Sequence, residues 1–108
     1  MPYFLIEGSY TPEGWAALAR NPEDREKSFT GLVERAGGKL KSFYYAFGAS
    51  DVIGIIETPD AVTAGSIAVS VTSVGHLKFF KTTPLMTNQE GMEVMKKAGV
   101  LKYQAPKG

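Results

Sequence analysis

Prolines that follow polar residues divide this chain into short segments, and they constrain its fold more than any other feature of the sequence. Thr11-Pro12 combines a polar N-cap residue with a proline at the first helical position. Asn21-Pro22 and Thr58-Pro59-Asp60 are two further helix-start signatures. Proline also disfavours the α conformation of the residue before it, so a helix begins or breaks at each point. We therefore expect a first helix that is split, resumes with Asn21 as its cap and ends at Gly37-Gly38.

Four runs of aromatic and aliphatic residues have the composition and spacing of strands. They cover residues 3–10, 39–47, 51–58 and 75–83. The short connection Gly48-Ala49-Ser50 favours an antiparallel hairpin between the second and third runs. Pro84 is expected to close the fourth strand.

Two further helices are expected in the second half of the chain. Residues 61–72 alternate partly like a strand, but the Pro-Asp start and the small residues on one side favour a helix. A C-terminal helix is predicted from Thr87, which has capping-box spacing to Glu90, as far as Gly99. Its methionines, Met92 and Met95, form a short apolar stripe.

The order strand, helix, strand, strand, helix, strand predicts an α+β fold. Right-handed connections in both halves give a ferredoxin-like βαββαβ domain. Its antiparallel four-stranded sheet has the order fourth, first, third, second, with a split first helix and an added C-terminal helix. At 108 residues the chain has room for one domain, with a core expected over about residues 1–98 and a loose tail over 99–108.

Strand alternation assigns residues to two faces of this sheet. The face under the helices is expected to hold Phe4, Ile6, Gly8, Leu40, Tyr44, Ala46, Val52, Gly54, Ile56, Leu77 and Phe79. The second face is expected to hold Tyr3, Leu5, Glu7, Phe43, Tyr45, Phe47, Asp51, Ile53, Ile55, Glu57, His76, Lys78 and Phe80. A bulge would exchange residues between the faces. Because the second set is too aromatic to be left in water, a homodimer packed sheet against sheet is the simplest cover.

Three titratable residues of the second face form the candidate catalytic or metal site. The two central strands, the first and third, are expected to run parallel, so Glu7 and Glu57 lie at the same end of the sheet, and His76 opens the fourth strand there. Two carboxylates and an imidazole suit a divalent metal ion or proton transfer. The alternative that we favour is that these charges face water and that Lys78 pairs with a glutamate, because the spacing matches no recognised metal motif.

Composition argues against several other classes of protein. A net charge of +1 is not that of a non-specific nucleic-acid binder, and a chain without cysteine has no disulfide, thiolate nucleophile or zinc ribbon. Lys78-Phe79-Phe80-Lys81 has the interleaving that stacks on bases, but the third strand carries no aromatic residue, so RNA binding is not expected. No apolar run spans a membrane and no basic leader precedes the first strand, so we expect a cytoplasmic protein.

The hairpin run from Phe43 to Ile53 resembles the GYD-domain family, which is named for a Gly-Tyr-Asp signature at this place. Three further segments are similar to the family: 37–40, 58–60 and 81–87. Gly48 and Asp51 match the signature, whereas Ser50 stands at the tyrosine position, which implies a smaller or wetter pocket if that tyrosine lines one. The resemblance implies a ferredoxin-like fold of the dimeric α/β-barrel type, found mainly in bacteria, with no established activity and no catalytic residues to transfer.

These observations favour a homo-oligomeric module that binds or senses a small apolar or aromatic molecule. Its expected ligand-binding residues are Tyr3, Phe43, Tyr45 and Phe80, and no cofactor is identified. One alternative is a small cofactor-free or metal-assisted enzyme, similar to a monooxygenase or isomerase, that uses His76 or one of the two carboxylates. Another is an accessory or assembly subunit with a filled interface and no ligand.

Overall fold

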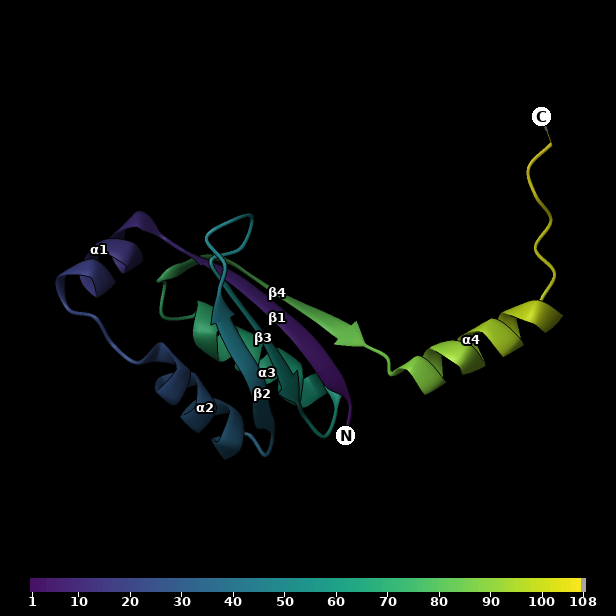
Figure 1. Ribbon diagram of the computed structural model, residues 1–108, viewed down its shortest axis with the longest axis horizontal. Helices are drawn as coiled ribbons and strands as arrows, with labels where there is room; N and C mark the ends of the chain where they lie inside the picture. The colour runs from purple at the N-terminus through teal and green to yellow at the C-terminus, as the bar shows by residue number, and fades with distance from the viewer. Residues whose placement is uncertain (108) are drawn as a thin grey trace.

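The structure is a computed structural model, and it describes residues 1–107. These residues form one four-stranded sheet and four helices (Figure 1). In chain order the elements are β1 (Tyr3–Tyr10), α1 (Pro12–Arg20), α2 (Arg25–Arg35), β2 (Lys39–Tyr45), β3 (Val52–Glu57), α3 (Ala61–Thr72), β4 (Leu77–Leu85) and α4 (Asn88–Val100). The α+β prediction is confirmed, and the ambiguous segment 61–72 is a helix. Gly108, the end of the expected tail, lies outside the described residues.

The sheet has the order β2-β3-β1-β4, and every neighbouring pair is antiparallel. The strand order is the predicted ferredoxin-like one, but the parallel direction expected for β1 and β3 is wrong. The helical crossover after β1 returns β2 in the same direction, and the following hairpin then reverses β3. Pro84 does not close β4, which continues to Leu85, because an edge strand tolerates the missing N–H group.

The split first helix is confirmed, although its second cap is not the expected residue. Thr11 caps α1 by accepting a hydrogen bond at Oγ1 from the Gly14 N–H at 3.0 Å. Asn21 ends α1 instead of starting α2, since its N–H donates to the Ala17 carbonyl. Asp24 caps α2 by accepting from the Lys27 N–H at 3.0 Å, a position that also suits its negative charge.

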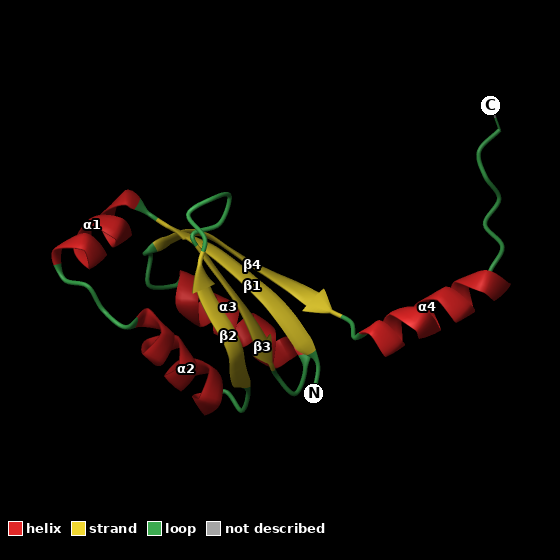
Figure 2. Cartoon of the chain, in the orientation of Figure 1, coloured by secondary structure: helices red, strands yellow, loops and turns green. Residues whose placement is uncertain are grey.

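The hydrophobic core lies between one face of the sheet and the helices α2 and α3, of which α3 is behind the sheet in Figure 2. Its buried residues are Phe4, Ile6, Val33, Ile56, Ala64 and Ile67. They come from the alternate positions of β1 and β3 that the sequence assigned to the helix side. The other face of the same sheet has none of this cover.

Two irregularities in the strand pairing exchange several aromatic residues between the predicted faces. The register shifts between Leu40 and Ser42 in β2, and between Ser9 and Tyr10 where β1 pairs with β4. One extra residue reverses the direction of every later side chain. Phe43, Tyr45 and Phe80 therefore lie on the helix side, opposite Gly54, Val52 and Gly8, whereas Tyr44 and Phe79 lie on the other face, opposite Ile53 and Ser9.

The C-terminal helix α4 extends from the end of β4, away from the sheet and the other helices (Figure 1). Its predicted capping box is present: the Thr87 hydroxyl accepts from the Glu90 N–H, and the Glu90 carboxylate accepts from the Thr87 N–H. The helix continues past Gly99 to Val100, and none of its residues is buried. Within residues 1–107, no helix is both long and apolar enough to cross a bilayer.

Candidate functional site

The sheet face opposite the core is lined by partly exposed residues and has no helix over it. We call it the open sheet face; it consists of Tyr3, Leu5, Glu7, Lys39, Tyr44, Ile53, Ile55, Glu57, Phe79, Lys81 and Leu85. Leu5, Ile53 and Ile55 form its centre on adjacent strands, and the ring of Tyr44 beside them is 69% exposed. An apolar surface of this kind is typical of a site that binds another molecule.

The predicted cluster of Glu7, Glu57 and His76 does not form. Because β1 and β3 are antiparallel, Glu57 lies opposite Tyr3 at one end of the sheet, while Glu7 lies opposite Ile53. Four residues of strand separate these positions, which corresponds to about 13 Å. His76 lies just before β4, beyond the Glu7 end and outside the open sheet face. Residues 1–107 contain no group of three or more acidic or histidine side chains placed to hold a metal ion.

The four charged residues of the open sheet face form two cross-strand pairs of opposite charge. Glu7 lies opposite Lys81, and Glu57 lies opposite Lys39, with no ion pair between them. In the described part of the chain the one ion pair is Arg25–Glu23, at 3.0 Å. The open sheet face therefore carries two carboxylates and two lysines with no ion pair among them, and the Glu7 carboxylate accepts a hydrogen bond from Ser50.

The hairpin loop after β2 closes one end of the sheet through Ser50 and Asp51. The Ser50 hydroxyl is buried and donates to the Glu7 carboxylate at 3.2 Å. The Asp51 carboxylate accepts from the Tyr10 N–H at 3.0 Å and from the Trp15 indole N–H at 3.1 Å. Asp51 thus fixes the loop to both β1 and α1.

Aromatic rings gather around the Asp51 anchor on the helix side. Trp15 lies 4.9 Å from Tyr10 and 5.8 Å from Phe47, measured between ring centroids, and Phe47 stacks on Tyr45 at 5.9 Å. Phe47 is 72% exposed and has a φ of 56°, a left-handed conformation that a bulky residue adopts only at a cost of about 1–2 kcal/mol. The loop holds a strained aromatic side chain at the surface, beside Trp15 and Tyr45.

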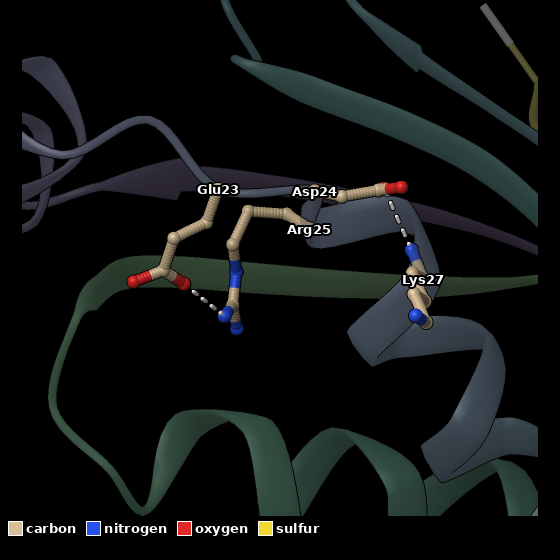
Figure 3. Close-up of polar contacts among 4 residues, drawn as sticks. All are labelled: Glu23, Asp24, Arg25 and Lys27. Atoms are coloured by element: carbon tan, nitrogen blue, oxygen red, sulfur yellow. Dashed lines mark hydrogen bonds and ion pairs between the residues drawn. The ribbon is translucent and has the colours of Figure 1, made fainter.

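A groove lies next to these rings, between the helices and the start of β4. Its first compartment has a volume of about 220 Å³ and is lined by Tyr10, Leu18, Glu23, Arg25, Val74 and His76. A second compartment of about 280 Å³ shares Tyr10, Arg25 and Val74 and continues over Phe29 and Phe80. Figure 3 shows that Arg25 reaches back to Glu23, beside the Asp24 cap of α2. The groove combines an apolar floor with two guanidinium groups, Arg25 and Arg35, the His76 imidazole and the Glu23 carboxylate that pairs with Arg25.

Tyr10 is a groove residue whose pKa is shifted by its surroundings. Burial raises the pKa of its phenol above the ordinary value of 10.0, and the nearby Tyr45 phenol adds to the increase. The Arg25 guanidinium acts in the opposite direction on the same pKa. The Tyr10 hydroxyl therefore remains protonated at neutral pH and is available as a hydrogen-bond donor.

The four expected ligand-binding residues separate into two groups. Tyr3 lies on the open sheet face, whereas Phe43 and Phe80 both pack near Phe29 of α2, with ring centroids 6.4 and 6.5 Å away. Tyr45 belongs to the aromatic cluster around Trp15. Sequence reasoning did not identify Tyr10, Trp15 or Arg25 as lining a site, because they come from three different elements. The aspartate of the hairpin signature was the one usable signal for this region.

Two comparisons with known proteins bear on this geometry. The sequence model of the GYD domain matches residues 4–95, which is most of the chain. A protein of Thermus thermophilus named "Glutamine synthetase and cystathionine beta-lyase binding protein" is 27% identical over 78 residues. That alignment covers 72% of this chain and 82% of the relative.

Proposed function

The chain belongs to the GYD-domain family, and from this membership we propose that it is a homo-oligomeric accessory protein that binds other proteins. The relative from Thermus thermophilus is named for binding two enzymes, glutamine synthetase and cystathionine beta-lyase. We carry over from that name only the class of activity, which is binding to a protein. The identity of the bound protein is left to experiment.

The open sheet face is the observation that carries the proposal. The same strands that bury Ile6 and Ile56 under helices leave Leu5, Ile53 and Ile55 only partly covered. Monomeric proteins rarely leave a contiguous apolar patch of this kind in water. We propose that a second copy of the chain covers it, sheet against sheet.

The charges around the apolar centre support a second copy as the occupant. The face carries Glu7 and Glu57 together with Lys39 and Lys81, so its formal charge is zero. A two-fold contact places the same surface on both partners, and a neutral mixed set lets each carboxylate approach a lysine of the other copy. A face of one charge sign would instead repel its own copy.

The test is the oligomeric state of an Ile53→Lys variant, measured by sedimentation at several protein concentrations. We expect the wild-type chain to be at least dimeric and the variant to dissociate, because a long charged side chain replaces an apolar one at the centre of the contact. Ala16→Lys, on the exposed side of α1, is the matched control and should associate as the wild type does. A monomeric wild-type protein, or an Ile53→Lys variant with unchanged mass, contradicts the proposal.

A second candidate function, binding of a small organic anion, is favoured by the groove at Tyr10. Its apolar walls, the Arg25 guanidinium and His76 suit a molecule with an aromatic or aliphatic body and a carboxylate. Native mass spectrometry of protein purified from its own host reports subunit number, bound metal and bound organic molecule together. A retained molecule should be lost in Arg25→Gln if it occupies this groove.

His76 separates binding from catalysis at the same groove. If the groove only binds a molecule, the His76→Ala variant should still retain that molecule. If the protein is an enzyme that uses the imidazole for proton transfer, the same variant should turn over its substrate about 10²-fold or more slowly. If the purified protein is oligomeric but retains no small molecule, the result favours the accessory role over small-molecule binding.

A further inference from the structure

Helix α4 is a well-specified helix that has nothing to pack against in its own chain. Its capping box fixes the start, yet none of its residues is buried and Met95 is 72% exposed. Helices of 13 residues are marginal in water, and glycine lowers their stability by a further 0.5–1 kcal/mol or so at each interior position. Both Gly91 and Gly99 have open space where a Cβ atom would lie. The chain alone gives no reason for either glycine.

The residues of α4 are divided into an apolar side and a charged side. At 100° per residue, one arc carries mainly small or apolar residues, which we call the α4 apolar face: Gly91, Met92, Met95, Ala98 and Gly99. Asn88, the first residue of the helix, is the one polar residue in this arc. The opposite arc carries the charged residues Glu90, Glu93, Lys96 and Lys97. The helix is therefore amphipathic, although it faces water on every side.

Helix α3 has the complementary property, because its exposed side lacks charged groups. It buries Ala64 and Ile67 against the sheet, and none of its residues from 61 to 72 is charged. Its outer face consists of Val62, Gly65, Ser66 and Val69; the valines are 78% and 67% exposed, and a Cβ atom at Gly65 would also meet open space. The Ser66 hydroxyl donates to the Val62 carbonyl of the same helix. Two exposed valines on the uncharged outer side of a helix are typical of a surface that packs against another element.

We propose that α4 is an exchanged arm, and that its apolar face packs on the α3 outer face of a second copy of this chain. The two helices have 13 and 12 residues, or about 20 and 18 Å of length, so the faces match from end to end. Neither face carries a charge that the contact would bury unpaired. This contact would explain why glycine occupies positions 65, 91 and 99, since glycine allows two helix backbones to approach closely.

A second copy fits this contact better than the same chain does. Only Met86 and Thr87 separate β4 from α4, and the helix leaves the body of the molecule in the direction of that strand (Figure 1). The resulting chain measures 57 Å along its longest axis and has a radius of gyration of 17.5 Å, compared with about 13 Å for a compact domain of this length. Reciprocal exchange of arms satisfies both faces of both copies.

This contact is independent of the proposed sheet-to-sheet contact, because α3 lies on the core side of the sheet. One copy can therefore make both contacts at once, and the chain can assemble beyond a dimer. The two proposed contacts can therefore be tested separately. Ile53→Lys changes the open sheet face and leaves α3 and α4 unaltered.

The absence of cysteine from the chain makes disulfide trapping a direct test. Two single-cysteine proteins, Val69→Cys on the α3 outer face and Met95→Cys on the α4 apolar face, are mixed and oxidised. We expect the mixed disulfide to form in about tenfold or greater excess over that formed by Val69→Cys with Gln89→Cys, which lies on the polar side of α4. Adding Gly65→Leu to the Val69→Cys protein should reduce the mixed disulfide to the control level, since nothing in its own chain contacts this position.

Several outcomes overturn the proposal. If the Val69→Cys and Met95→Cys proteins form no more mixed disulfide than the Val69→Cys and Gln89→Cys control pair, α4 does not pack on the α3 outer face. Preferential trapping of Met95→Cys with itself shows α4 packed on α4, and trapping with Ile53→Cys shows the arm on the open sheet face. If a chain with both cysteines forms its bridge internally at every dilution, the arm folds back on its own α3.

Discussion

The contrast between the two sheet faces is visible in two adjacent residues of β3. Ile56 points toward α2 and α3 and is fully buried, whereas Ile55 points to the open sheet face and remains partly exposed. The residue type, the strand and the backbone conformation are the same, so the difference is only what covers each face. One copy of the chain is thus complete on one side of its sheet and incomplete on the other.

The largest expected effect is on the covered side. Ile56→Ala removes a fully buried side chain from the centre of the core, and we expect a loss of about 2–5 kcal/mol in the free energy of unfolding. Urea denaturation followed by circular dichroism measures the loss. A change well under 1 kcal/mol would mean that Ile56 is not part of a close-packed core.

The matched variant Ile55→Ala sharpens the comparison. In the dissociated chain it should reduce the free energy of unfolding by less than Ile56→Ala does, because this side chain is already in partial contact with water. In the assembled protein it should weaken association, which sedimentation measures. Equal losses for the two variants in dilute, dissociated protein would contradict the difference between the faces.

The next effect concerns Asp51, which joins the hairpin loop to β1 and α1 at the end of the sheet. Asp51→Ala leaves the Tyr10 N–H and the Trp15 indole N–H without their acceptor, and we expect a loss of about 1.5–3 kcal/mol in the free energy of unfolding. Trp15 is the only tryptophan, so its emission reports the change directly. Asp51→Asn keeps an acceptor oxygen and should lose less; an equal loss would show that the negative charge, not the acceptor, is essential.

A smaller effect is expected at alkaline pH on the helix side. Because burial raises the pKa of Tyr10 above 10.0, its phenol favours the folded state below the unfolded-state pKa, and this contribution is lost as the pH rises through the folded-state pKa. Spectrophotometric titration should show one tyrosine that ionises late. Tyr10→Phe should remove that late component; if it persists, another tyrosine is responsible.

The smallest effect is expected at Asp60, the exposed N-cap of α3. Hydrogen bonding to the side chain of Thr63 and to its N–H, the latter 2.8 Å long, lowers the pKa of this carboxyl below 3.8. Its contribution to stability is therefore present above the unfolded-state pKa and is lost as the pH falls through the lower folded-state pKa. Asp60→Asn keeps a capping oxygen and should flatten this part of the acid unfolding curve. An unchanged acid limb would show that other carboxyl groups determine it.

Much of the local structure followed from the sequence because its causes are local. Residues 61–72 form a helix with the predicted bounds, since Asp60 supplies a cap at one end, and α4 starts at Thr87 because both halves of the capping box lie within four residues. The strand order also followed, because short right-handed connections leave few other arrangements. The candidate site did not follow, as Tyr10, Trp15 and Arg25 come together from three elements that no spacing connects.

The sequence by itself determined the element types, their caps and the presence of one sheet face with too many apolar residues. Tertiary structure decided which residues occupy that face, because one unpaired residue, Lys41 in β2 or Lys78 in β4, reverses every side chain after it in its strand. It also decided that Glu7 and Glu57 lie apart, since strand direction depends on the hairpin between β2 and β3. Periodicity records how residues alternate along a strand, whereas register and direction are set by contacts between strands that are distant in the sequence.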